Sequence, residues 1–115
     1  FFDFLKEALN GKASAVKVSS RLKSAPACIS TEGGISLEME KMLSMQMNAA
    51  DRMKAQKVLE LNTEHPIFAK MKELYEKDPE KAKDYVNILF DQALLLEGIP
   101  PENPSDFSAR ILALL

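Results

Sequence analysis

The side chains that most often carry chemistry are scarce in this chain of 115 residues, which holds one histidine and one cysteine. His65 stands directly before Pro66, and because proline suits the first position of a helix, we expect His65 to cap a helix. Cys28 lies in the short apolar run 27–29 and is expected to be a small hydrophobic residue of the interior. Catalysis needs a nucleophile, a base and a stabilising group placed together. We therefore predict no catalytic residue from the sequence.

Other kinds of chemical site are equally hard to build from these residues. A Cys28–His65 pair, as in a small cysteine hydrolase, is the one enzymatic alternative, and no third residue completes it. One histidine and one cysteine are too few for a zinc site. The segment 32–34 (EGG) lacks the spacing and the lysine of a phosphate-binding loop. We therefore expect no cofactor and no metal in this chain.

Charge and hydropathy narrow the class of protein. Residues 1–58 carry nine basic and six acidic side chains, and residues 59–115 carry six and eleven. A weakly basic first half without interleaved aromatic residues does not indicate nucleic-acid binding. No apolar run reaches the roughly 20 residues of a membrane span, and no leader is evident. A lone cysteine fits a reducing compartment, so we expect a cytoplasmic protein with neither nucleic acid nor membrane as a partner.

Helical spacing of apolar residues appears in several segments. The first covers residues 1–10 and is closed by Gly11. A second begins at Leu37. Three more begin after a capping residue and a proline, a start signal that recurs at 65–66, 78–79 and 103–104. Of these, the helix from residue 79 is expected to run to Gly98.

Three short segments have the composition of strands. Val16 and Val18 alternate with polar residues, residues 27–29 form a short apolar run, and the two are expected to pair as a hairpin. A third strand is expected at 58–61. The fold class predicted is therefore α+β, with a small three-stranded sheet packed by helices in a single domain of residues 1–115. Because the chain opens at Phe1 directly on a helical pattern, we expect a piece of a longer protein.

The helix over 79–98 has more apolar surface than one core can cover. Its polar residues Lys83, Asp84, Asn87 and Asp91 fall within a wedge of about 100° on the helical wheel. Apolar residues occupy most of the rest, so the helix is expected to be buried on two sides. The uncharged apolar end 111–115 would also expose an apolar patch to water unless another surface packs on it. A homodimer that pairs residues 79–115 of two copies satisfies both, and a central core helix in a monomer is the alternative.

Gln92 lies inside the apolar arc of that helix. The simpler interpretation is that its amide reaches solvent or a nearby backbone group. In a dimer, a buried amide at such a position would instead fix the register of the two copies.

Methionine is concentrated in one stretch of the chain. Five of the six methionines, Met39, Met42, Met45, Met47 and Met53, lie within 15 residues. Flexible thioether side chains fit many apolar shapes and recur on surfaces that bind varied partners. The alternative is an ordinary core stripe of Met39, Met42, Leu43 and Met47. Because other helices already offer apolar faces to a small sheet, we expect this face to contact unfolded or partly folded protein.

Four motifs occur at residues 20–28 (SRLKSAPAC), 58–67 (VLELN and HPI), 89–98 (LFDQALLLEG) and 107–111 (FSARI). Together these motifs resemble the C-terminal dimerisation domain of the heat-shock protein 90 chaperones. Each is weak alone, but their order and approximate spacing also match, and the resemblance covers essentially the whole chain. The chain lacks the acidic tail of the eukaryotic cytosolic members and is more similar to the bacterial ones.

This resemblance implies a homodimer in which the last two long helices of each copy form a four-helix bundle. By position, the interface would contain Leu89, Phe90, Gln92, Ala93, Leu94, Leu96, Phe107, Ile111, Leu112 and Leu115. The amphipathic helix that faces client protein in the family corresponds to residues 36–48, and the contacts would be Met39, Met42, Leu43, Met45 and Met47. The family is an ATPase, and its site for ATP and Mg²⁺ lies in an N-terminal domain outside this chain.

The function predicted is therefore dimerisation and client contact within an ATP-dependent chaperone that assists protein folding under stress. This chain by itself is not expected to be an enzyme. A plain homo-oligomerisation module without client binding is the alternative.

Overall fold

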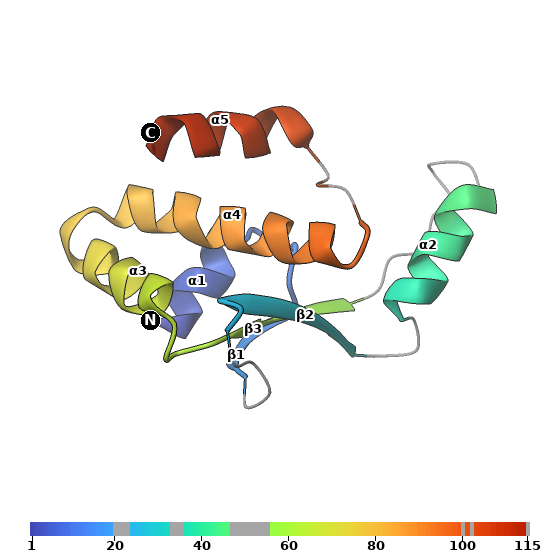
Figure 1. Ribbon diagram of the computed structural model, residues 1–115, viewed down its shortest axis with the longest axis horizontal. Coiled ribbons are helices and arrows are strands. Elements are labelled where there is room, and N and C mark those ends of the chain that lie inside the picture. The colour runs from blue at the N-terminus through green and yellow to red at the C-terminus, as the bar shows by residue number, and fades with distance from the viewer. Residues whose placement is uncertain (20–23, 33–35, 47–55, 100, 102, 115) are drawn as a thin grey trace.

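A computed structural model describes residues 1–19, 24–32, 36–46, 56–99, 101 and 103–114 (Figure 1). These residues form an α+β fold, as predicted. In chain order the elements are α1 (Phe2–Ala8), β1 (Ala15–Val18), β2 (Ala27–Glu32), α2 (Leu37–Gln46), β3 (Gln56–Leu61), α3 (Pro66–Lys77), α4 (Pro79–Leu96) and α5 (Pro104–Leu114).

The sheet has the strand order β1-β3-β2, so the predicted hairpin of the first two strands is wrong. Strand β1 pairs with β3 in parallel, with Ala15 beside Val58, and β2 pairs with β3 antiparallel, with Ala27 beside Leu61. Val58, Leu59 and Leu61 are all buried. A strand with successive buried residues is covered on both faces and belongs in the centre of a sheet, which explains why β3 separates the other two.

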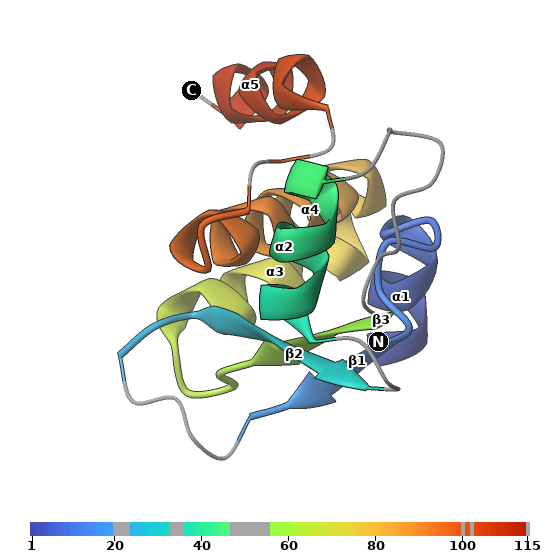
Figure 2. The same cartoon turned by 90° about the vertical axis from the view of Figure 1, so that its right-hand side faces the viewer.

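Helices α1, α3 and α4 pack together with the sheet around one core. Figures 1 and 2 show three tiers, with the sheet at the bottom, α4 above it and α5 on top. Helix α2 stands at one end of the molecule, beside the sheet. The largest fully buried side chains are Leu5, Leu9, Leu59, Leu61, Met71, Val86, Phe90 and Leu94.

The helix starts follow the local signals in the sequence. His65 caps α3, because its Nδ1 accepts a hydrogen bond of 3.1 Å from the backbone N–H of Ile67. This confirms the capping role predicted for the only histidine. Asp78 accepts from the N–H of Lys81 at the start of α4, and Asn103 caps α5 in the same way. Each cap precedes a proline, which fits the first turn of a helix.

The exposed face of α3 carries an ion pair of the kind that stabilises a helix locally. Lys77 Nζ lies 2.8 Å from Glu73 Oε1, one turn earlier. The hydrogen bond and the charge of Lys77 lower the pKa of Glu73, and Glu73 raises the pKa of Lys77 by the same contacts. Because both side chains are fully in water, the pair contributes little to the stability of the whole fold.

Candidate interaction surfaces

Helix α4 divides its side chains among three neighbours. Its core face carries Ala82, Val86, Leu89, Phe90, Ala93 and Leu94, all buried in one chain. Asn87 faces α1. Its Nδ2 donates a hydrogen bond to the backbone carbonyl of Ala8, and its Oδ1 accepts one from Lys12 Nζ; both donor–acceptor distances are 3.0 Å. Asp84 and Asp91 face α5. Three of the four residues of the polar wedge predicted from the sequence, Asp84, Asn87 and Asp91, therefore contact other elements of the same chain, while Lys83 pairs with Glu80 of its own helix.

One row of α4 remains outside these contacts and is called here the outer row. It consists of Ile88, Gln92 and Leu96, which recur every four residues and so form one ridge along the helix. None of the three belongs to the hydrophobic core cluster. The side chain of Leu96 is 68% exposed, and its neighbour Leu95 is also exposed. Ile88 and Gln92 are half-buried, so the second apolar side predicted for this helix is uncovered in one chain mainly at its C-terminal end, at Leu95 and Leu96.

Helix α5 contains no buried residue among those described. Leu112 is 66% exposed, Ile111 is also exposed, and Phe107 is half-buried. Arg110 lies 3.9 Å from a carboxylate oxygen of Asp84 and 3.9 Å from one of Asp91. These distances are long for ion pairs. The helix therefore contacts α4 through Arg110, while its apolar residues Ile111 and Leu112 remain exposed.

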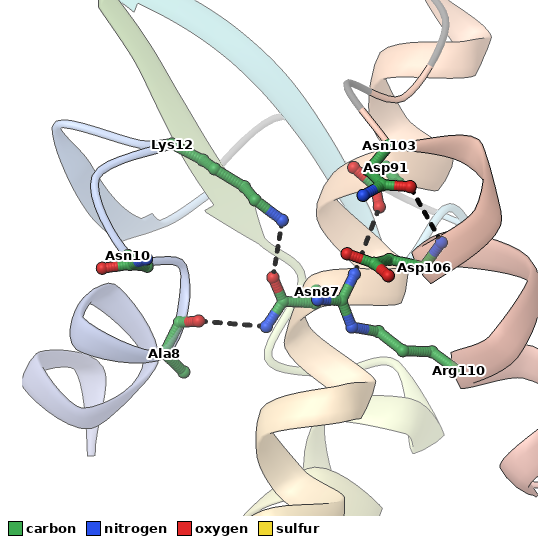
Figure 3. Close-up of a pocket in the computed structure, with 8 residues that line it drawn as sticks. All are labelled: Ala8, Asn10, Lys12, Asn87, Asp91, Asn103, Asp106 and Arg110. Carbon is green, nitrogen blue, oxygen red and sulfur yellow. Dashed lines mark hydrogen bonds and ion pairs between the residues drawn. The ribbon is translucent and has the colours of Figure 1, made fainter.

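A polar pocket of about 340 Å³ lies between α1, α4 and α5 (Figure 3). Its lining residues are Ala8, Asn10, Lys12, Asn87, Asp91, Asn103, Asp106 and Arg110. Two cationic and two anionic side chains face the same space, so their charges balance. Such a lining does not select a ligand of one charge sign. We interpret the pocket as a polar gap between α5 and the rest of the chain.

Helix α2 presents methionine to solvent. Met39 is 45% exposed and Met42 is 57% exposed. Leu37, on the other side of the helix, packs against the core cluster. The first turn is fixed by Ser36, whose Oγ accepts a hydrogen bond of 3.2 Å from the N–H of Met39. The two methionine side chains of α2 that the structure describes, Met39 and Met42, therefore lie on the surface.

A buried ion pair joins α2 to the sheet. Lys57 Nζ lies 2.7 Å from Glu40 Oε1, and the two side chains are only 7% and 11% exposed. Lys57 belongs to β3, the central strand, so the pair connects α2 to the most buried part of the sheet. Burial of two charges is favourable only with close contact and further hydrogen bonds. Moving α2 away from β3 would separate the two charges, so the pair favours the observed position of α2.

The predicted interface residues fall into two groups. Four of them, Leu89, Phe90, Ala93 and Leu94, fill the core of one chain and offer little surface to a second copy. Gln92, Leu96, Phe107, Ile111 and Leu112 are exposed or half-buried. Leu115 lies outside the described residues, and so do Met47 and the side chains of Leu43 and Met45.

Several residues that shape these surfaces were not singled out by the sequence analysis. Leu95 is exposed but is not among the predicted interface residues. The Glu40–Lys57 pair cannot be recognised from the local sequence, because its members are 17 residues apart and on different elements. Arg110 lies within the motif at 107–111, and its contacts with α4 depend on how α5 folds back.

Comparison with known proteins places the chain in a family. The family model described as Hsp90 protein matches residues 1–115. The chain therefore belongs to the Hsp90 family.

Its relatives include bacterial chaperone proteins named HtpG. The chain is 51% identical to the HtpG of Clostridium perfringens strain 13, 46% to that of Clostridium acetobutylicum and 44% to that of Alkaliphilus metalliredigens. Each match covers 99% of this chain but 18% of the relative. The chain thus spans about a fifth of the length of these relatives. Within its described part, no helix is long and apolar enough to cross a membrane.

Proposed function

We propose that this chain is the C-terminal dimerisation domain of an HtpG-type chaperone of the cytoplasm. In this proposal α4 and α5 of two copies form a four-helix bundle, and α2 contacts unfolded or partly folded client protein. ATP and Mg²⁺ would be bound by an N-terminal part of the longer protein. Joining two copies permanently raises the effective concentration of their remaining domains for each other, so that ATP-driven closure can clamp a client.

The observation that carries the proposal is the uncovered apolar surface of the last two helices. Leu95, Leu96, Ile111 and Leu112 are exposed, although α4 already fills the core with its opposite side. Monomeric proteins rarely leave large apolar patches in water, and such patches mark interaction sites. A second copy offers the same two helices and covers both sets at once, as closed symmetry requires.

The test of dimerisation uses α5, because this helix has no buried residue and can be changed without opening the core. We expect the chain to sediment at twice its mass of 12.8 kDa. The double variant Ile111→Glu with Leu112→Glu should sediment as a monomer with unchanged circular dichroism. The matched control, Ala109→Glu with Ala113→Glu, adds the same charge at two other exposed positions of α5 and should remain dimeric. A dimer that survives both the double variant and truncation after Pro101 would refute the helix-pair interface.

A plain oligomerisation module is the second candidate function, and it shares the same interface. The exposed methionines of α2 favour the chaperone assignment, because a module that only pairs has no use for them. Binding of a chemically unfolded protein by the dimer separates the two candidates.

A further inference from the structure

The turn that follows α1 is made by Asn10 and Gly11, and both residues are exposed. Their φ angles are positive, 51° for Asn10 and 84° for Gly11, in a region that suits glycine and that asparagine tolerates. The N–H of Gly11 has no hydrogen-bond acceptor among the described residues. Apart from its chain neighbours, no atom lies within 4 Å of the place where a Cβ on Gly11 would be. The backbone nitrogen of Gly11 is therefore open to water and to the side chain before it.

An asparagine followed by a glycine can react with its own backbone. The nitrogen of Gly11 loses its proton and attacks Cγ of Asn10; a C–N bond forms, the Cγ–Nδ2 bond breaks, and the proton leaves with the nitrogen as ammonia. Water then opens one of the two carbonyls of the cyclic imide, which gives aspartate or isoaspartate. Glycine favours the attack because no side chain hinders its nitrogen and its backbone is free to rotate. The reaction consumes water, releases ammonia and needs no enzyme.

The other described asparagines each lack a condition for this reaction. Asn62 and Asn87 are only 5% exposed, and both atoms of each side-chain amide are engaged in hydrogen bonds. Asn103 precedes Pro104, whose nitrogen carries no proton. The side chain of Asn10, by contrast, makes no hydrogen bond among the described residues. Asn10 is therefore the reactive asparagine of the described part of the chain.

The turn also joins α1 to α4, so its geometry matters beyond its own residues. Lys12 donates a hydrogen bond of 3.0 Å to Asn87 of α4, and Ala13 is buried with 3% exposure. Figure 3 shows Lys12 reaching from this turn to Asn87. Aspartate at position 10 would keep the length of the main chain. Isoaspartate would add one carbon atom to the main chain and so displace Lys12 and Ala13 from their contacts.

We propose that Asn10 is a site of spontaneous deamidation, and that its isoaspartate product loosens the contact between α1 and α4. Either product also adds a negative charge beside the polar pocket, whose lining includes Asn10. This inference does not depend on the proposed function, because it uses only the exposed turn and its contacts within one chain.

The first experiment stores the folded 115-residue chain at neutral and at mildly alkaline pH and follows it by trypsin digestion and mass spectrometry. Cleavage after Lys6 and Lys12 isolates residues 7–12, in which Asn10 is the only asparagine. The mass of this peptide should rise by the difference between a hydroxyl and an amino group. The rise should be faster at alkaline pH, because the nitrogen of Gly11 must lose its proton. Asn62 and Asn87 in the same sample are matched controls and should not change.

Two variants test the chemistry of the pair. Gly11→Ala should slow the conversion by at least about tenfold, because a methyl group then flanks the attacking nitrogen and restricts the backbone. Asn10→Gln keeps an amide and the glycine but would need a larger ring, so its peptide should keep its mass. Circular dichroism before storage shows whether each variant is folded.

The second experiment separates the added charge from the added backbone atom. Asn10→Asp carries the charge on a main chain of normal length and should unfold at the same temperature as the fresh original chain. The stored chain should unfold a few degrees lower, in proportion to its isoaspartate content, which an isoaspartate-specific methyltransferase measures.

The outcomes test the two parts of the inference separately. An unchanged mass of peptide 7–12 in the folded chain, or equal conversion of Asn62 and Asn87, would overturn the assignment of Asn10. A stored chain that contains isoaspartate and unfolds at the same temperature as Asn10→Asp would overturn its effect on the contact between α1 and α4.

Discussion

At the scale of single residues, Lys57 and Glu40 form the most deeply buried of the ion pairs described above. Both charges are almost completely removed from water and meet at 2.7 Å. Removing one member of such a pair leaves the other buried without its counter-charge, and this is more damaging than replacing both. The pair is also the ionic connection between the sheet and the methionine-bearing helix, so its loss affects the position of α2 as well as stability.

We expect Lys57→Met to lower the free energy of unfolding by about 3 kcal/mol. The double variant Lys57→Met with Glu40→Leu should recover most of that loss, because no buried charge remains. Urea denaturation measures the free energy, and hydrogen exchange of residues 37–46 reports whether α2 is released. Glu38→Gln, an exposed change on the same helix, serves as the control and should alter neither. Equal stability of the single variant and the original chain would mean that the pair is not the anchor of α2.

At the scale of elements, the local signals in the sequence were enough to place every predicted helix and strand. Pro66, Pro79 and Pro104 each follow a capping residue and each begins a helix, because capping depends on atoms within a few residues. The pairing of strands was predicted wrongly, because it depends on a strand that arrives some 40 residues later. The sequence also does not show which apolar residues of α4 belong to the core. Leu89 and Leu96 are the same residue type in one apolar arc, and only the position of the neighbouring elements distinguishes them.

Helix α2 has exposed residues that can be changed without disturbing the fold. Leu37 and Glu40 attach one side of it, and Met39 and Met42 project from the other. We expect Met39→Glu with Met42→Glu to change the free energy of unfolding by less than about 1 kcal/mol. The same variant should lose the ability to suppress aggregation of an unfolded protein, because two charges break up the apolar contact face.

The control for that experiment is Thr63→Glu with Ala69→Glu, which adds equal charge at two exposed positions elsewhere. It should suppress aggregation as well as the original chain. Cooperative unfolding of the methionine variant would instead show that Met39 and Met42 belong to a core. Full suppression by the methionine variant would mean that client contact does not depend on Met39 and Met42. Failure of the original chain to suppress aggregation would favour the plain oligomerisation module.

At the scale of the whole molecule, the proposed dimer would link stability to assembly. The uncovered apolar residues of α4 and α5 are in water in a single chain and out of water in a dimer. Anything that binds the folded state and not the unfolded state stabilises the fold by mass action. The single chain should therefore be less stable than the pair, and its apparent stability should depend on concentration.

We expect the midpoint of thermal unfolding to rise by about 3 °C for each tenfold increase in protein concentration, as for a dimer of this size that unfolds to two chains. Calorimetry between about 1 and about 100 µM, a range that spans common affinities, measures this. The variant Ile111→Glu with Leu112→Glu should have a midpoint that is lower and independent of concentration, since it unfolds as a monomer. The variant Ala109→Glu with Ala113→Glu should follow the original chain. A constant midpoint for the original chain over this range would mean that the exposed surfaces of α4 and α5 are not covered by a second copy.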